Sequence, residues 1–317
     1  MLQLDAEQVA ARLGRRPLID ALERAFQREY HVPARLHYAV SMPQNAENTL
    51  LIMPAWRPGG CIGVKLATVF PGNAEFGQTA VHATYALFDA ATGAPLAVLD
   101  GTELTRRRTA AASALAARYL ASPHASRLLM VGTGGLAHHV IESHAVVRPI
   151  SSVRIWGRQL DRAEAVVRDL SGKQYEVQAV DDLEAAVRWA DVISCATLAE
   201  TPLVHGAWLR PGQHLDLIGS FTPAMREVDD DALMRASIYV DTRAGALADS
   251  GELVHALATG AITDASIRGE LRDLARGIAS GRRSAEEITL FKSVGCALED
   301  LAAAELAIAP SAPFPPL

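Results

Sequence analysis

The sequence predicts an α/β protein with a doubly wound parallel sheet in its later part and a smaller α+β region before it. After Pro123, short apolar segments alternate with segments of helical periodicity, an order typical of a parallel sheet covered by helices. A glycine-rich turn joins the first of these strands to the helix that follows it. The first third of the chain instead combines helical periodicity with short strands bounded by turn residues.

The N-terminal third begins with one or two amphipathic helices over residues 4–27, with a break near Pro17. An alanine-rich helix over residues 104–120 ends this region, and we expect the domain boundary inside it. Between them, the segment Asp89–Pro95 has the Gly and Pro of a hairpin turn. The strands expected in this region cover residues 50–53, 61–69, 84–88 and 96–99.

Strands and helices alternate from residue 128 onward. The expected strands cover residues 128–131, 153–156, 192–196, 214–218 and 238–240, and the expected helices cover residues 136–145, 161–170 and 182–189. The C-terminal part should hold helices over residues 284–291 and 298–308, followed by a proline-rich tail over 310–317 that would not be ordered by itself.

Length and composition exclude several classes of protein. The 317 residues, half of them hydrophobic, suffice for two domains with a sizeable core. A net charge of −6 with scattered basic residues argues against a nucleic-acid partner, and no apolar stretch approaches the ~20 residues that span a membrane. The N-terminus lacks the features of a signal peptide, so we expect a cytoplasmic protein. Cys61, Cys195 and Cys296 have no C-x-x-C spacing and are expected to be small buried hydrophobes in a reducing compartment.

The segment Leu128–Ala137 contains the pattern G-x-G-x-x-A between a strand and a helix. In this pattern Gly132 allows a tight turn, Gly134 lets the backbone approach a pyrophosphate, and Ala137 lets the helix pack closely on the sheet. The alternative is a glycine turn with a structural role only. We expect a dinucleotide site formed by Gly132, Thr133, Gly134, Gly135, Leu136 and Ala137.

The end of the next strand, Val153–Trp156, distinguishes the two nicotinamide cofactors. Enzymes that use NAD usually carry an acidic residue there for the ribose 2′-hydroxyl, whereas an arginine accommodates a 2′-phosphate. This chain has Gly157, which leaves room for the phosphate, and then Arg158. NADPH is therefore the expected cofactor, with NADH binding more weakly. The alternative for Arg158 is a solvated surface arginine at a turn.

The order of five motifs resembles that of the ornithine cyclodeaminase/μ-crystallin family, over nearly the whole chain. The motifs are Gly63-Val-Lys65-Leu, Leu99–Ala111, Gly132–Ala137, Cys195-Ala196-Thr197 and Leu217–Glu227. The resemblance implies a homodimeric NAD(P)-dependent enzyme that acts on amino acids or cyclic imino acids. It implies a Rossmann domain over residues 113–291 and an α+β substrate-binding and dimerisation domain formed by residues 1–112 with 292–317.

The same resemblance implies roles for individual residues. Lys65 is similar to the substrate-facing lysine of the family, and Arg108 to the arginine that holds the substrate carboxylate. Arg35 is similar to a second arginine that binds this carboxylate. A guanidinium suits a carboxylate because it donates two parallel hydrogen bonds, and a buried lysine can donate a proton. Solvent-facing positions are the alternative for Lys65 and Arg108. The implied cofactor contacts also include Thr109, Ala196, Thr197, Val294 and Gly295.

One position departs from the family's pattern. Cyclodeaminases and alanine dehydrogenases of the family resemble each other in carrying an aspartate two residues after the glycine that corresponds to Gly219, and this chain has Phe221 there. A carboxylate that would handle a primary amine is therefore missing, and an apolar side chain suits a cyclic imine. We expect an NADPH-dependent ketimine reductase that converts Δ1-pyrroline-2-carboxylate or Δ1-piperideine-2-carboxylate to proline or pipecolate.

Two alternatives remain open at this point. One is an ornithine cyclodeaminase or amino-acid dehydrogenase of the same family, and the other is a non-catalytic, crystallin-like NADPH-binding protein. A metal site is not expected, although His138, His139, Glu142 and His144 are close in sequence, because they fall on the helix after the glycine turn. Asp241, at the end of a strand, could close the cofactor site or cap a helix.

Overall fold

The computed structural model describes residues 1–42 and 45–309, and the chain divides into two compact units. The first unit comprises Met1–Arg108 and the chain from Cys296 onward, and the second comprises Thr109–Gly295. The domain limits expected from the sequence, 112/113 and 291/292, each lie four residues from these breaks. The proline-rich tail over residues 310–317 lies outside the described residues.

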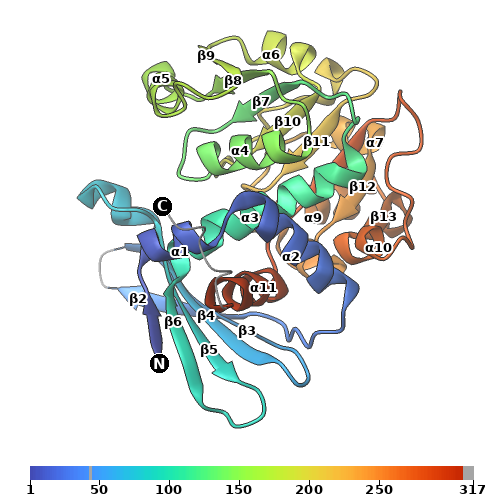
Figure 1. Cartoon of the computed structure of the whole chain (residues 1–317). Coiled ribbons are helices and arrows are strands. Elements are labelled where there is room, and N and C mark those ends of the chain that lie inside the picture. The colour runs from blue at the N-terminus through green and yellow to red at the C-terminus, as the bar shows by residue number, and fades with distance from the viewer. Residues whose placement is uncertain (43–44, 310–317) are drawn as a thin grey trace. The chain divides into compact units, whose positions relative to one another are not determined.

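The first unit contains a six-stranded sheet in the order β1-β6-β5-β4-β3-β2 (Figure 1). Neighbouring strands are antiparallel, except that β1 and β6 are parallel. The strands are β1 (Leu2–Leu4), β2 (Leu36–Met42), β3 (Asn45–Trp56), β4 (Cys61–Val69), β5 (Val81–Asp89) and β6 (Pro95–Asp100). The strands expected over residues 50–53, 61–69, 84–88 and 96–99 lie within β3 to β6, and β3 is much longer than expected. Two strands were not expected from the sequence: β1, which is very short, and β2, an edge strand with mostly exposed residues.

One face of this sheet is buried. Met53, Lys65, Tyr85 and Leu99 are in register across β3, β4, β5 and β6, and all four are buried. The C-terminal helix α11 (Ala297–Ile308) contacts β3, β4 and β5. Lys65 is therefore the one charged member of an otherwise uncharged row.

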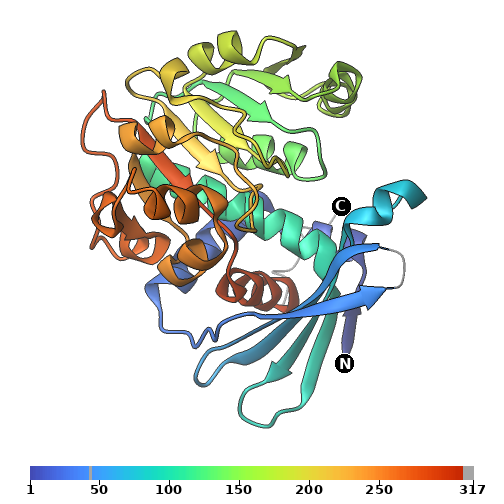
Figure 2. The same ribbon diagram turned by 180° about the vertical axis from the view of Figure 1, so that it is seen from behind.

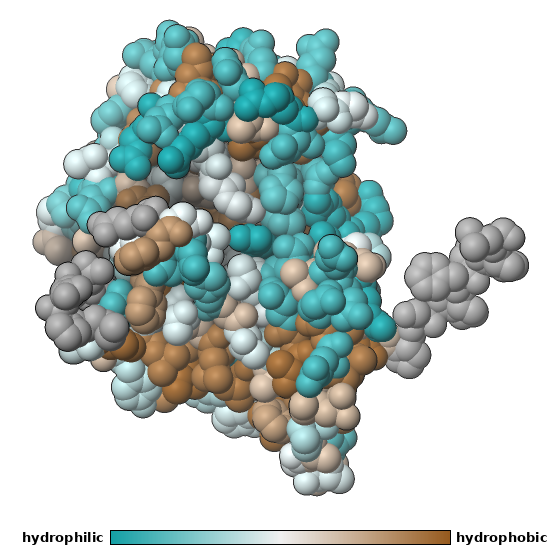
Figure 3. All heavy atoms as spheres, turned by 90° about the vertical axis from the view of Figure 1, so that its left-hand side faces the viewer, coloured by the Kyte–Doolittle hydropathy of each residue, from teal (hydrophilic) through white to brown (hydrophobic). Residues whose placement is uncertain are grey.

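The other face of this sheet carries apolar side chains that stay exposed. Leu36 on β2 and Leu66 on β4 are both in register with Ile52 on β3, so their side chains lie on the same face of the sheet. Tyr38 on β2 and Trp56 on β3 lie two and four residues further along their strands, and side chains at even spacing share a face. Leu36 is 47% exposed, Tyr38 50%, Trp56 36% and Leu66 44%. Figure 3 shows apolar side chains gathered at the height where Figure 1 places this sheet.

The other helices of the first unit are α1 (Ala6–Arg12), α2 (Arg15–Gln27) and the 3-10 helix η1 (Pro71–Phe76). Asp5 caps α1 by accepting a hydrogen bond from the backbone of Gln8. The helices are separated at residues 13–14, so the break expected near Pro17 is displaced. Pro17 lies in the first turn of α2, where a proline is tolerated. Helix α3 (Gly101–Leu120) belongs to both units.

The second unit contains an eight-stranded parallel sheet in the order β13-β12-β14-β11-β10-β7-β8-β9. This confirms the doubly wound fold class. The strands are β7 (Arg127–Val131), β8 (Ser152–Trp156), β9 (Glu176–Val180), β10 (Val192–Cys195), β11 (His214–Leu217), β12 (Ser237–Val240), β13 (Ile267–Glu270) and β14 (Thr289–Lys292). The helices are α4 (Ala137–Val147), α5 (Leu160–Asp169), α6 (Leu183–Trp189), α7 (Asp230–Arg235), α8 (Arg243–Asp249), α9 (Gly251–Ala258) and α10 (Leu271–Ala275), with 3-10 helices η2 (Gly206–Trp208) and η3 (Asp264–Ser266).

Helices lie on both faces of the parallel sheet (Figure 2), and each face has its own apolar core. On β7, Leu129 and Val131 join the core formed with α6, α7 and α9. Leu128 and Met130 join the core formed with α3, α4 and α5. Strands buried on both faces read as continuous apolar runs, which is the pattern that predicts this sheet.

The expectation of a helix over residues 284–291 is wrong, because residues 289–292 form β14 in the middle of the sheet. All four residues of this strand are buried, including the polar Thr289 and Lys292. A short run of this length has no period that distinguishes a strand from a helix, and the preceding Ala285-Glu286-Glu287 favours a helix. Strands β9 and β13 were not expected from the sequence either.

Two further sequence expectations bear on the fold. No helix within residues 1–42 and 45–309 is long and apolar enough to cross a membrane. Cys195 and Cys296 are buried as expected, whereas Cys61 is only half-buried, and all three are free thiols.

Candidate active site

The glycine-rich turn lies between β7 and α4 in the second unit. Gly132 has φ of 122°, which favours glycine, and a Cβ there would lie 2.6 Å from the carbonyl oxygen of Ala196. A Cβ at Gly134 would meet no atom within 4 Å, so this part of the turn is open to a ligand. No side chain caps α4 at Leu136. The turn and the first amides of α4 therefore fit a pyrophosphate group.

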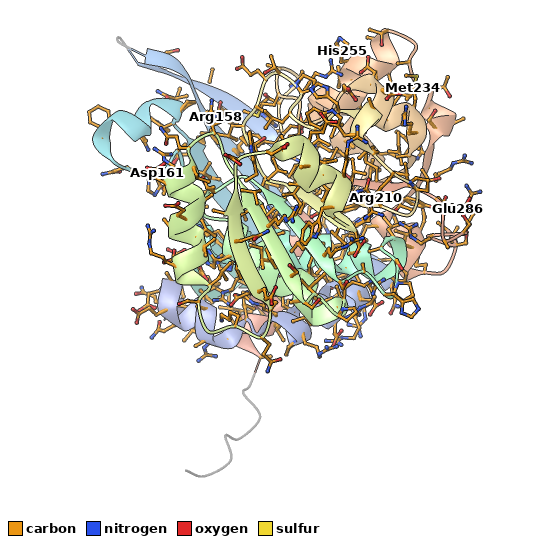
Figure 4. All side chains as sticks on the ribbon, turned by 90° about the horizontal axis from the view of Figure 1, so that it is seen from above. Arg158, Asp161, Arg210, Met234, His255 and Glu286 are labelled. Atoms are coloured by element: carbon orange, nitrogen blue, oxygen red, sulfur yellow. The ribbon has the colours of Figure 1, made fainter. Side chains whose placement is uncertain are left out.

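Gly157 and Arg158 follow β8, the strand next to β7. A Cβ at Gly157 would lie 2.7 Å from Cγ2 of Thr133, so the close approach of the two turns depends on glycine. Arg158 is exposed, and Figure 4 shows it with Asp161 at the start of α5. Asp161 lies in the first turn of that helix and not at the end of β8, where an acidic residue would bind a ribose 2′-hydroxyl.

The strand order β9-β8-β7-β10-β11-β14 is that of a dinucleotide-binding sheet, with its crevice at the carboxyl ends of the strands. Ala196 and Thr197 follow β10 at this edge, and Val294 and Gly295 follow β14. The backbone N–H groups of Val294 and Gly295 donate to Oδ2 of Asp241 at 2.8 and 2.6 Å. Asp241 is fully buried, so its role is to fix the turn after β14.

Phe221 and Thr109 are the remaining residues of the second unit that were expected from the sequence to contact substrate or cofactor. Phe221 is half-buried in the loop after β11, and Thr109 is half-buried in α3. The carboxylates of Glu227 and Glu252 contact the loop after β11, but both are buried and accept hydrogen bonds from protein donors. Both carboxylates are therefore occupied by donors of the protein itself.

In the first unit, Lys65 and Arg108 meet at one carboxylate. Nζ of Lys65 is 2.7 Å from Oδ2 of Asp300, and Nε of Arg108 donates to Oδ1 of the same residue at 2.8 Å. Nη1 of Arg108 donates to Oε2 of Glu299 at 2.7 Å. All four residues are buried, and the acids lie in the first turn of α11. Glu299 and Asp300 were not among the site residues expected from the sequence, where they look like acids in the first turn of a helix.

The cluster of Lys65, Arg108, Glu299 and Asp300 sets the proton affinities of its members. Burial lowers the pKa of Lys65 to about 8, with help from Arg108 and against the attraction of Asp300. Burial acts to lower the pKa of Arg108 as well, but Asp300 and Glu299 outweigh it, and the net shift is upward. The pKa of Asp300 lies below its ordinary value, because Arg108 and Lys65 overcome the effect of burial. The cluster thus holds a permanent cation, Arg108, and a lysine whose pKa is lowered to about 8.

Arg35 lies half-buried just before β2. Leu36, the next residue, is the first residue of β2 and is in register with Ile52 on β3. Both Arg35 and Lys65 belong to the first unit, and a shared role in one site stays a prediction.

The histidines near the glycine turn do not form a metal site. His144 is buried, with Nε2 3.2 Å from Oδ2 of Asp216, whereas Glu142 forms an ion pair with Lys173 at 2.5 Å. In the described part of the chain, no group of three or more His, Cys, Asp or Glu side chains is arranged to hold a metal ion.

The family model described as "Ornithine cyclodeaminase/mu-crystallin family" matches residues 2–309. A Δ1-pyrroline-2-carboxylate reductase of Paracoccus denitrificans is 42% identical over 80% of this chain and 80% of that protein. The solved structure of Thermococcus litoralis Δ1-pyrroline-2-carboxylate reductase, in complex with NADH and L-proline, has a TM-score of 0.93 and 31% identity, over 97% of this chain and 96% of that one. An archaeal alanine dehydrogenase dimer with bound NAD has a TM-score of 0.90 and 29% identity, over 97% and 94%.

The fold and the glycine turn define a Rossmann protein built to bind a nicotinamide dinucleotide. The match over almost the entire described chain then identifies it as a member of the ornithine cyclodeaminase/mu-crystallin family.

Proposed function

We propose that this NAD(P)H-dependent oxidoreductase reduces the C=N bond of a cyclic ketimine, Δ1-pyrroline-2-carboxylate or Δ1-piperideine-2-carboxylate, to proline or pipecolate. The observation that carries the proposal is the buried pairing of Lys65 and Arg108 on Asp300. Such a substrate has a carboxylate next to the imine carbon, and this pairing places an anion-binding group beside a proton donor. The names of the relatives from Paracoccus denitrificans and Thermococcus litoralis support the same substrate class.

In this proposal, Arg108 binds the substrate carboxylate. Glu299 and Asp300 use two of its five N–H groups, and the others remain for an anion. Arg35 supplies a second contact to the carboxylate. Lys65 donates its proton to the imine nitrogen, and burial together with Arg108 eases this loss because both lower its pKa to about 8. Reduced nicotinamide, when bound, supplies the hydride for the carbon of the C=N bond.

Phe221 separates this activity from the two alternatives within the family. Ornithine cyclisation and amino-acid oxidation both begin with a primary amine, which needs a group to orient and deprotonate it. Phe221 supplies no such group, and the carboxylates of Glu227 and Glu252 are already satisfied by protein donors. A cyclic imine needs only a proton at nitrogen and a hydride at carbon.

The test is an assay of the purified protein for oxidation of NADPH and NADH with each cyclic imine. We expect turnover with the imines, and negligible ammonia release from ornithine with NAD. Ammonia release at a rate that rivals imine reduction would contradict the proposal in favour of a cyclodeaminase. Cofactor binding without turnover of any of these compounds would favour a crystallin-like binding protein.

We propose NADPH as the preferred cofactor, with NADH weaker, because Arg158 follows β8 and no acidic residue stands there. Arg158 would bind the 2′-phosphate beside Gly157 and Thr133. The other proposed cofactor contacts are Thr109, the turn from Gly132 to Ala137, Ala196, Thr197, Val294 and Gly295.

We also propose that two copies of the chain form a homodimer in the cytoplasm. The exposed apolar face of the six-stranded sheet, with Leu36, Tyr38, Trp56 and Leu66, supports a second copy as its occupant. The dimer of the archaeal relative supports the same state. The free thiols are compatible with a reducing compartment.

A further inference from the structure

A buried network of charged side chains lies under the loops that follow β10 and β11 in the second unit. Oε1 of Glu227 accepts hydrogen bonds from the backbone N and the Oγ1 of Thr197, at 2.7 and 2.9 Å. Its Oε2 accepts from the backbone N of Gly219 at 2.9 Å. One carboxylate therefore ties together the loops after two neighbouring strands.

The position of Glu227 is itself fixed by Glu252 and Lys292. Oε1 of Glu252 accepts from the backbone N of Glu227 at 2.8 Å, and Oε2 accepts from the hydroxyl of Ser220. Nζ of Lys292, on β14, donates to the backbone oxygen of Ser220 at 2.7 Å and lies 3.4 Å from Oε2 of Glu252. Glu227, Glu252 and Lys292 are fully buried. Burying two carboxylates and one ammonium group costs desolvation free energy, so we look for a role of these side chains beyond packing.

The loops tied by this network are on the nicotinamide side of the sheet. Val131, Cys195, Leu217 and Lys292 are in register across β7, β10, β11 and β14. The turn after β7 takes the pyrophosphate and the end of β8 takes the adenosine ribose, so the strands on the other side of β7 serve the second mononucleotide. Thr197 and Gly219 stand just beyond this registered row.

The two loops also touch without intervening side chains. A Cβ on Gly219 would lie 2.1 Å from the backbone N of Thr197 and 2.4 Å from Oε1 of Glu227. A small displacement of the Glu227 carboxylate would therefore shift both loops together.

We propose that Glu227 is a positioning residue that holds the Thr197 and Gly219 loops in the conformation that binds the nicotinamide half of the cofactor. Glu252 and Lys292 keep its carboxylate in place. This inference rests on the nicotinamide dependence in the proposed function and not on the identity of the imine.

The ionised form of Glu227 is the one that fits three donors, because a protonated carboxyl would point a hydrogen at one of them. Burial raises the pKa of Glu227 to about 7, and Lys292 lowers it while Glu252 raises it further. Lys292 on β14, Glu252 on α9 and the thiol of Cys195 on β10 are the titratable groups that face it. Positioning by Glu227 should therefore weaken as the pH falls through neutrality.

The experiment measures binding by calorimetry for NADH and for ADP, a probe of the adenosine half alone. Glu227→Gln keeps the volume of the side chain but turns an amide N–H₂ toward a backbone donor. At pH 8 we expect this variant to bind NADH about tenfold more weakly, with ADP affinity within about twofold of wild type. Glu286→Gln, an exposed substitution of the same kind (Figure 4), should change neither affinity.

A second arm needs no variant. The affinity of the wild type for NADH should fall about tenfold between pH 8 and pH 6, as one group of pKa near 7 gains a proton. Hydrogen exchange should report lower protection factors for the amides of Thr197 and Gly219 at pH 6, after correction for the slower intrinsic exchange at that pH. In Glu227→Gln both changes with pH should be absent.

Equal losses of NADH and ADP affinity in Glu227→Gln would overturn the proposal, as would a flat pH dependence in the wild type. A lower melting temperature with unchanged NADH affinity would show a role in stability only, and would also overturn it. If Glu227→Gln does not fold, the same NADH and ADP affinities are measured for Glu252→Gln, and the pH dependence of the wild type is the second test. No imine is present in these measurements, so a protein that passes them but reduces no imine refutes the proposed substrate and leaves this inference standing.

Discussion

Replacement of Asp300 by asparagine should damage the first unit in two measurable ways. Asp300 is fully buried and contacts both Lys65 at 2.7 Å and Arg108 at 2.8 Å. The asparagine side chain would keep the shape but remove the charge, which leaves two buried cations with Glu299 as the remaining anion of the cluster. Loss of one partner from a buried ion pair costs about 3 to 5 kcal/mol, so we expect Asp300→Asn to lose about that much unfolding free energy in urea titrations.

The second consequence concerns the proton on Lys65. Asp300 is the strongest influence that raises the pKa of this lysine, so its removal should lower that pKa further below its ordinary value. The alkaline decline of kcat/KM for the imine should move to lower pH by at least about one unit.

Glu305→Gln is the matched control for Asp300→Asn. Glu305 lies on the same helix and pairs with Arg57 at 3.2 Å, but both side chains are partly exposed, so its loss should cost less than about 1 kcal/mol. Two results would contradict this role of Asp300. One is a loss of unfolding free energy in Asp300→Asn no larger than in the control, and the other is an alkaline decline of kcat/KM at the same pH as in wild type.

Three further outcomes follow from named contacts. Imine reduction should decline as the pH rises through about 8, because Lys65 then loses the proton it donates, and Lys65→Met should be slow at every pH. A rate that stays constant to about pH 10 would refute this role. Arg158→Ala should weaken NADPH about tenfold and leave NADH almost unchanged, with the wild-type preference shrinking at high salt. Arg168→Ala, at the other end of α5, should change neither affinity, and an equal loss for both cofactors in Arg158→Ala would show a surface residue only. Leu66→Lys should shift the protein to a monomer in sedimentation velocity, because it places a charge on the exposed sheet face. Met234→Lys, an exposed substitution on α7 (Figure 4), should leave the mass unchanged, and a Leu66→Lys dimer would exclude this face as the interface.

Features that depend only on neighbouring residues in the chain could be predicted from the sequence. The turn from Gly132 to Ala137 depends on residues within one strand and one helix, so its glycines identify it without the rest of the fold. The alternation of apolar strands and helices likewise follows from neighbours in the chain. These two features were sufficient for the sheet and the cofactor class.

Contacts between distant segments were not predictable in the same way. Arg108 and Asp300 are 192 residues apart, and no local pattern indicates that they pair. Glu299 and Asp300 look like ordinary first-turn acids, which favour a helix start by themselves. Strand β14 was unpredictable for the same reason. Its four residues have no periodicity that identifies a strand, and they form one because they pair with β11 and β12 on either side.

The buried charges explain why these missed contacts matter for function. In a sheet row with Met53, Tyr85 and Leu99, a lysine is tolerated because Asp300 receives its ammonium group. Burial and Arg108 lower the pKa of Lys65 while Asp300 raises it, and the balance at about 8 leaves a cation that can still release a proton at neutral pH. A lysine without Asp300 would release its proton at a lower pH, and one without Arg108 would hold its proton more tightly. The contacts that make Lys65 structurally acceptable therefore also determine whether it can act as an acid, and stability measurements alone cannot describe a substitution in this cluster.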